Sequence, residues 1–215
     1  TAVVVQAPYN GNPEADGLFI YHHLTGTAER LLTEGDALTS LNGEVGSLLG
    51  LPTDSVYGSF GILPQLNALG LGCICAEITG TPLGLSANEA LLRFGGPEGV
   101  AVLMAESQSL GTSGRFVEAF RHRPYMNDET GITWVISTRS TLLQSPPPGF
   151  PNTNDNPDHA LMAWLPEIQT QPILVAQSGE MHAPTTGGSA ELGILFQPRI
   201  NNQNHILVAS GARAP

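Results

Sequence analysis

The residues with the clearest chemical potential are Arg121, His122 and Arg123, which stand together directly ahead of Pro124. Arginine presents a planar fork of donors that binds a carboxylate or a phosphate through two parallel hydrogen bonds. We therefore expect these residues to lie at the end of a helix and to form the most positive patch of the molecule, and one interpretation of the patch is a site for an anion or an acidic partner. In the alternative, structural interpretation they cap the carbonyls of a helix end and pair with nearby acids, namely Glu118, Asp128 or Glu129.

Other residue types that support chemistry are present, but their spacing predicts no catalytic or metal site. The six histidines show no helical i, i+4 pair and no HExxH or paired CxxC motif, so we expect no metal site and no cofactor. They are His22, His23, His122, His159, His182 and His205. Cys73 and Cys75 are separated by one residue, and such neighbours on a strand point to opposite faces. We expect both thiols to be unpaired and buried.

The amino-terminal residue of the sequence, Thr1, precedes a strand-like AVVV run. A threonine at a free amino terminus can act as a nucleophile, with its own amine as the base. An N-terminal-threonine hydrolase is therefore one of the function hypotheses.

Several short motifs resemble the YrdC family. Residues 51–58 read LPTDSVYG and resemble that family's PT(D/E)TVYG motif, while 121–124 resemble its KxRP motif, with arginine in place of lysine. Further fragments are similar at 157–159 and 178–180. The family makes threonylcarbamoyl-adenylate from threonine, bicarbonate and ATP. The resemblance implies a nucleotide-binding enzyme with a concave pocket that joins Thr53, Arg121 and Arg123.

The charge of the chain is sparse and unevenly distributed. Charged residues make up 13% of the sequence, about half of the ~25% that is usual for globular proteins. Lysine is absent, and the net charge is −8 over residues 1–92, zero over 93–139 and −3 over 140–215. General nucleic-acid binding needs a basic face, so only the small arginine patch could contact a nucleic acid. A surface so poor in charge favours contacts with copies of the same chain or with other subunits.

The hydrophobic pattern predicts both strands and short helices. A buried strand is expected at 100–105 and a second strand at 132–137, with others at 2–7, 18–24, 72–79 and in the C-terminal third at 172–177, 192–196 and 205–210. Short helices are expected at 28–32, 88–94 and 116–120, and a weaker one within 35–50. Pro124 is expected to end the third helix.

Together these elements predict one α+β domain over residues 1–215, rich in strands, largely antiparallel in the C-terminal third, with a few short helices. The proline-rich segment 145–156 is the candidate internal boundary. No apolar run reaches the ~20 residues of a membrane span, and no signal peptide opens the chain. The leading function hypothesis is a non-catalytic structural or interaction subunit of a larger assembly, such as a viral coat or surface protein. The compartment is left open, with a virion among the options.

Overall fold

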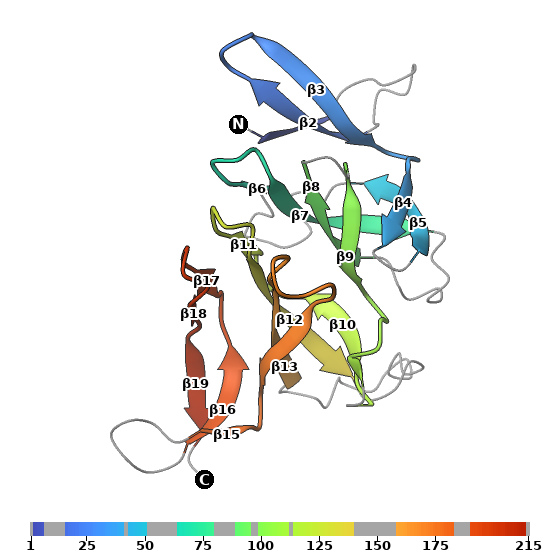
Figure 1. The fold of residues 1–215 in the computed structure, drawn as a ribbon. Helices are drawn as coiled ribbons and strands as arrows, with labels where there is room; N and C mark the ends of the chain where they lie inside the picture. The colour runs from blue at the N-terminus through green and yellow to red at the C-terminus, as the bar shows by residue number, and fades with distance from the viewer. Residues whose placement is uncertain are drawn as a thin grey trace.

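The computed structural model is built from β-strands, so the expected α+β fold class is wrong. It describes residues 2–6, 16–40, 43–50, 64–79, 89–95, 99–111, 114–139, 158–182 and 190–213. Over these ranges the chain forms strands β1 to β19 and no α-helix. The segment 145–156, which contains the candidate domain boundary, lies outside the described residues. Figure 1 shows the strands stacked from β1–β3 at one end, through β4–β9, to the C-terminal strands at the other end.

The N-terminal strands form a three-stranded antiparallel sheet in the order β1-β2-β3. Their bounds are Ala2–Gln6, Asp16–His22 and Thr27–Thr33. The turn between β2 and β3 uses Gly26 at a φ of 67°, a conformation that glycine reaches without the steric cost of a side chain. Leu18 and Leu32 face the core, and the outer half of β3 is exposed.

The second sheet closes on itself. It follows the order β5-β4-β9-β8-β7-β6, and β5 also pairs with β7, which completes a ring of five strands. The bounds are β4 Ala37–Ser40, β5 Gly43–Gly50, β6 Gln65–Leu66, β7 Gly72–Thr79, β8 Glu89–Phe94 and β9 Ala101–Ala105. All pairings are antiparallel except β4 with β9. The ring is closed between β4 and β9 by one pair, Ser40 with Val102, and both edges of β7 and β8 are occupied by neighbouring strands.

The third sheet holds the most deeply buried strand. Its order is β10-β12-β13-β14, with β11 also paired to β12. The bounds are β10 Phe116–Phe120, β11 Tyr125–Met126, β12 Ile132–Arg139, β13 Asp158–Trp164 and β14 Ile173–Gln177. Within β12 every residue from 132 to 138 is buried, because both of its faces are covered. Trp134 and Ile136 lie in the main core, while Val135 packs in a second cluster with Leu195.

The remaining strands form two small antiparallel sheets, the arrangement expected for the C-terminal third. One has the order β15-β16-β19 and the other pairs β17 with β18. The bounds are β15 Met181–His182, β16 Ala190–Leu195, β17 Arg199–Ile200, β18 Ile206–Leu207 and β19 Ser210–Arg213. Leu195 of β16 is fully buried against Val135 and Leu161, so β16 covers the outer face of the third sheet.

Each expected helix is a strand, whereas the strands expected at 100–105 and 132–137 are confirmed as β9 and β12. The segment 28–32 lies in β3, 35–50 contains β4 and β5, 88–94 contains β8, and 116–120 is β10. Segments as short as 28–32, 88–94 and 116–120 cannot hold a helix by their own propensity in water. Pairing with strands that are already buried therefore decides their conformation.

Candidate functional site

Arg121, His122 and Arg123 lie in the connection between β10 and β11, not at the end of a helix. Their expected role as helix caps is therefore wrong. The backbone N–H of Arg121 donates to the Val135 carbonyl at 3.0 Å, which fixes this connection beside the central strand β12.

The three side chains have different partners. The exposed Arg121 places Nη2 3.9 Å from Glu118 Oε2, as the structural interpretation expected. With the Gln65 amide of β6 turned so that its oxygen faces Arg123, the Arg123 guanidinium donates to that oxygen. His122 faces the C-terminal part of the chain and forms a hydrogen bond with the backbone of Leu195. The structure therefore does not gather the three residues around one ligand, and their binding of an anion or an acidic partner stays a prediction.

Partial burial of His122 disfavours its charged form. Burial is the main cause that lowers the pKa of His122 below the ordinary 6.5, and the nearby His159 and Arg121 act in the same direction. The hydrogen bond to Leu195 opposes this shift. Since a bond that favours the protonated ring must be donated by the ring, His122 donates to the Leu195 carbonyl.

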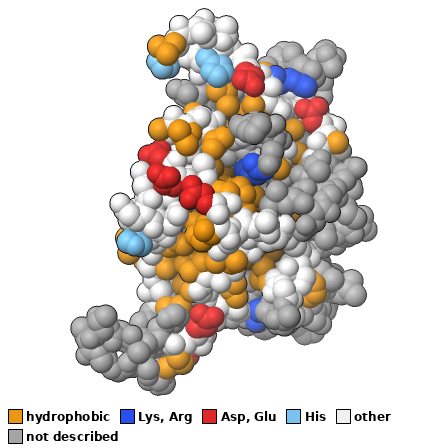
Figure 2. All heavy atoms as spheres, in the orientation of Figure 1, with side chains coloured by type: hydrophobic (Ala, Val, Ile, Leu, Met, Phe, Trp, Pro, Cys, Tyr) orange, Lys and Arg blue, Asp and Glu red, His pale blue; other side chains and the backbone are white. Residues whose placement is uncertain are grey.

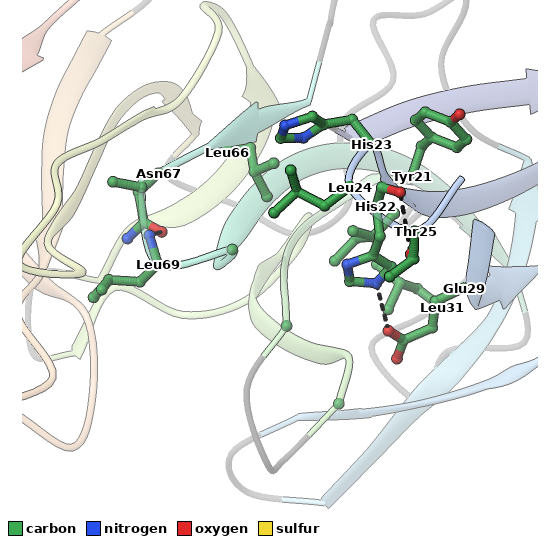
Figure 3. A pocket seen from close by; sticks show the side chains of 15 residues that line it. Tyr21, His22, His23, Leu24, Thr25, Glu29, Leu31, Leu66, Asn67 and Leu69 are labelled. Atoms are coloured by element: carbon green, nitrogen blue, oxygen red, sulfur yellow. Dashed lines mark hydrogen bonds and ion pairs between the residues drawn. The ribbon is translucent and has the colours of Figure 1, made fainter. Parts of the chain in front are cut away.

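A pocket of about 640 Å³ lies elsewhere, between the turn joining β2 and β3 and the turn joining β6 and β7. Figure 3 shows Leu24 from the first turn pointing toward Leu66, with His23 beside it. His22 and Glu29 also line the pocket, and Nε2 of His22 lies 3.1 Å from Oε2 of Glu29. The lining residues include no arginine, so this pocket offers no guanidinium to a phosphate. It also does not join Arg121 to Arg123, and Thr53 lies outside the described residues.

The structure describes the two cysteines and most of the histidines, but not Thr1 or residues 51–58. Cys73 and Cys75 are unpaired and fully buried, which confirms the expectation for both. Burial is the main cause that raises the pKa of each thiol far above its ordinary value. The described residues contain no group of three or more His, Cys, Asp or Glu side chains arranged to hold a metal ion. Thr1 and the 51–58 motif lie outside the described residues.

The most unusual surface feature is a set of exposed apolar side chains in the C-terminal third. Among described residues eleven large hydrophobic side chains are exposed, and eight of them lie between residues 168 and 207. Three are consecutive in β14, where Ile173, Leu174 and Val175 are 41%, 38% and 42% exposed. Ile194 and Phe196, on either side of the buried Leu195, are also exposed. Figure 2 shows apolar atoms at the surface over the region of β13 and β16.

Strands β14 and β16 are held close together by the turn that follows β14. Gly179 N donates to the Leu192 carbonyl at 2.8 Å, and Leu192 N donates back to the Glu180 carbonyl at 2.9 Å. The Ser178 hydroxyl donates to the Gly193 carbonyl at 2.8 Å. We define the β14–β16 surface as the exposed apolar side chains that these two strands and their ends carry: Ile173, Leu174, Val175, Ile194 and Phe196.

Sequence reasoning predicted a strand over 172–177 but did not identify it as a binding edge. The available signal is composition, because the strand residues ILVAQ include no charged side chain. Natural edge strands are usually protected by charge, proline or bulges. The exposure itself depends on which strands lie next to β14, and this is decided by the fold.

Comparison with protein families, with curated proteins and with solved structures found no match. Among the described residues no helix has the length and apolar character required to cross a membrane.

Proposed function

We propose that this protein is a non-catalytic structural subunit that assembles with copies of itself through the β14–β16 surface. The observation that carries the proposal is the edge strand β14, which exposes three consecutive apolar side chains and carries no charge. In a strand covered on one face, exposed and buried residues alternate. The run of exposed residues in β14 shows that both of its faces reach solvent before Ala176 becomes buried.

A second copy suits this edge better than a charged partner does. The net charge of the chain is −11, so two copies repel each other over much of their surface and approach best where charge is absent, as it is on β14. An antiparallel contact centred on Val175 would place Leu174 near Ala176 of the other copy, with no like charges opposed.

Several other edge strands carry charged residues and are less suited to this contact. β3 carries Glu29 and Arg30, β10 carries Glu118, and β19 carries Arg213. β1 reads AVVVQ and also lacks charge, but the burial of its side chains lies outside what the structure describes.

The expected association is weak for a single contact. Complete burial of an aliphatic side chain contributes roughly 1.5–3 kcal/mol. Covering the exposed two-fifths of the three β14 side chains therefore contributes roughly 2–4 kcal/mol for each copy. Association itself costs about 4 kcal/mol or more. The three β14 side chains alone therefore leave at most about 4 kcal/mol, which corresponds to a Kd of about 1 mM or weaker. Covering the exposed part of Ile194 and Phe196 adds roughly 1–3 kcal/mol for each copy. With these contacts we expect concentration-dependent assembly in the range of about 10 μM to 1 mM.

A substitution that places charge at the centre of the contact tests the proposal. In Val175→Glu, two carboxylates would approach each other across the antiparallel contact, and like charges opposed across strands are destabilising. We expect the variant to remain monomeric by sedimentation velocity at concentrations where the native protein associates. Circular dichroism and thermal unfolding check that the variant is folded.

Leu24→Glu is the matched control, because Leu24 is 88% exposed but lies on the β2–β3 turn. This variant should associate like the native protein. Equal association of Val175→Glu and the native protein would contradict the proposal. Equal loss of association in both variants would place the effect in overall charge and not in β14.

A further inference from the structure

One tight turn recurs along the chain after the strands β3, β9 and β14. After β3, Thr33 N donates to Asp36 Oδ2 at 2.8 Å, and Asp36 N donates back to the Thr33 carbonyl at 3.0 Å. The same two bonds join Ala105 to Gln108 and Gln177 to Glu180. The turns begin at residues 33, 105 and 177, so consecutive copies are 72 residues apart. A constant interval between identical turns indicates an internal repeat.

A hairpin with the sequence pattern Pro-x-apolar-Asn recurs as well. The pattern reads PQLN at 64–67, PYMN at 124–127 and PRIN at 198–201, and it leads into the hairpins β6–β7, β11–β12 and β17–β18. In each hairpin Oδ1 of the asparagine accepts the backbone N–H of the fourth residue after it. These donors are Leu71, Gly131 and His205. The hairpin therefore marks the start of a repeated unit.

The three-stranded runs β1-β2-β3, β7-β8-β9 and β12-β13-β14 are built alike. In each run the middle strand pairs antiparallel with both neighbours. The pairing with the third strand shifts register directly after one leucine of the middle strand, which is Leu18, Leu91 or Leu161. The strands β1, β7 and β12 are therefore counterparts, and one edge of each is covered by a middle strand.

A fourth strand joins each run to the next. β5 pairs with β7, β10 with β12 and β16 with β19. After β10, Arg121 N donates to the Val135 carbonyl at 3.0 Å. After β16, Phe196 N donates in the same way to the Ala209 carbonyl at 2.9 Å. β18 and β19 therefore correspond to the first strand of a run, and the chain is a tandem array of four-stranded units.

β18 and β19 lack the middle strand that covers their counterparts. β1 is covered by β2, β7 by β8 and β12 by β13, whereas among the described residues β19 pairs with β16 alone. Leu207 is 73% exposed, while Cys73 and Thr133, which hold the same register position in their hairpins, are fully buried. Terminal units of repeat arrays usually present a polar outer face, which Leu207 does not. We call the uncovered side of residues 206–213 the β19 edge.

The β19 edge offers backbone donors to a further strand. The Ala209 carbonyl accepts from Phe196 N, so the polar backbone groups of Ala209 face β16. Because the direction of these groups alternates along a strand, the N–H groups of Val208 and Ser210 face the β19 edge. An uncovered edge of this kind is a template for pairing with another strand.

The three hairpins also stack on one another in a repeating way, along one side of the molecule (Figure 1). Asn67 Nδ2 donates to the Asn127 carbonyl at 3.2 Å, and Asn127 Nδ2 donates to the Asn201 carbonyl at 2.6 Å. Asn201 holds the same position in the third hairpin, but within the part of the chain that the structure describes its Nδ2 has no acceptor. The stack therefore presents an open donor where a further hairpin would be bonded.

We propose that the β19 edge accepts the middle strand of a further unit of this repeat, in antiparallel orientation. The occupant follows from the counterparts, whose covering strands begin with an acid and continue with apolar residues: DGLFIYH, EALLRF and DHALMAW. The register of β7 with β8 places Ser210 opposite the residue equivalent to Ala90, and Ile206 opposite the equivalent of Phe94. This inference does not rest on the proposed function, which concerns the β14–β16 surface.

A synthetic peptide of residues 87–95, ANEALLRFG, tests the β19 edge by NMR on the full chain. We expect saturable chemical-shift changes at residues 206–213 with peptide up to about 1 mM, and amide exchange of Val208 and Ser210 slowed about tenfold. A nitroxide at the amino end of the peptide should broaden Gly211, and one at the carboxyl end should broaden Ile206. Val175→Glu should bind the peptide like the native protein, which separates this site from the proposed assembly.

The substitution Ser210→Pro removes one N–H of the β19 edge, and an edge strand tolerates proline where its N–H would face solvent. We expect loss of peptide binding, whereas the control Ser210→Ala, which keeps the N–H, should bind like the native protein. Circular dichroism checks that both variants are folded.

The proposal would be overturned by any of three results. These are no shift changes at residues 206–213 up to about 1 mM peptide, equal binding by folded Ser210→Pro, and broadening by the two nitroxides in the opposite order. If Ser210→Pro does not fold, the peptide with Leu92→Pro replaces it, because this change removes an N–H from the other side of the same pairing. Undiminished binding of that peptide to the native protein would also overturn the proposal.

Discussion

Asn127 joins two turns that are distant in sequence, and its removal should destabilise the C-terminal part of the molecule. The side chain is 4% exposed. Its Oδ1 accepts from the buried Gly131 N–H at 2.7 Å, and its Nδ2 donates to Asn201 O at 2.6 Å and to Asn204 Oδ1 at 2.8 Å. Asn127→Ala removes all three bonds and leaves one buried N–H unpaired. Such a group costs about 1–3 kcal/mol and each lost bond about 1 kcal/mol.

With the unpaired Gly131 N–H at about 1–3 kcal/mol and the other two bonds at about 1 kcal/mol each, we expect the free energy of unfolding to fall by about 3–5 kcal/mol in Asn127→Ala. This corresponds to a decrease in Tm of roughly 10 °C for a chain of this size. Urea unfolding followed by circular dichroism measures the change. Asn127→Asp keeps the acceptor for Gly131 and should give an intermediate value. Asn202→Ala, which removes exposed contacts to Asp128, should cost less than about 0.5 kcal/mol. A stability of Asn127→Ala within that margin of the native protein would refute the reasoning.

Three further predictions concern the core and the arginines. Thiol reagents should label Cys73 and Cys75 only at the rate of unfolding, because both are fully buried and burial raises the pKa of each thiol; rapid labelling of the native protein would contradict this. Gly72→Ala should destabilise by about 1–3 kcal/mol in urea unfolding, since its Cβ would overlap the Phe94 ring and the Gln65 carbonyl; unchanged stability would show that these neighbours can move. Arg123→Ala should lower stability by about 1–2 kcal/mol through loss of the contact with Gln65, whereas Arg121→Ala, which removes an exposed ion pair, should cost less than about 1 kcal/mol; the reverse order would refute the assignment.

The strands at 100–105 and 132–137 were predictable because their composition leaves little choice. β9 is a continuous apolar run, and β12 is rich in β-branched residues. Both strands are covered on two faces, so every side chain must be apolar or small. A short run of apolar or β-branched residues therefore predicts a strand whichever strands lie next to it.

The prediction of a helix at 116–120 was wrong because the strand in this segment contains a β-bulge. The pairing of β10 with β12 is irregular between Val117 and Ala119, so Glu118 is an extra residue in the strand. This bulge places Val117 and Phe120 in the same core although they are three residues apart. A spacing of three is also the helical spacing, and the sequence does not distinguish the two.

The prediction of helices at 28–32 and 88–94 was wrong because both segments are rich in residues that favour helices. The residues AERLL and EALLRF are good helix formers by intrinsic propensity. In the structure Leu91 and Leu92 are nevertheless both fully buried, because β8 lies between β7 and β9. Tertiary pairing of this kind outweighs a propensity of a few tenths of a kcal/mol per residue.

The candidate site was predictable only in its residue types. The grouping of Arg121, His122 and Arg123 along the chain suggested one positive patch. Their side chains diverge because each meets a different element, and the partner of His122 comes from β16. Contacts between residues so far apart in sequence depend on how the sheets pack, and single-sequence patterns do not report this.

The central claim is that copies of this protein associate through the β14–β16 surface. Sedimentation velocity of the native protein over about 10 μM to 1 mM at neutral pH tests it most directly. We predict a concentration-dependent rise in mass above the 22.6 kDa of one chain, abolished in Val175→Glu and retained in Leu24→Glu. A single monomeric species at every concentration would contradict the claim.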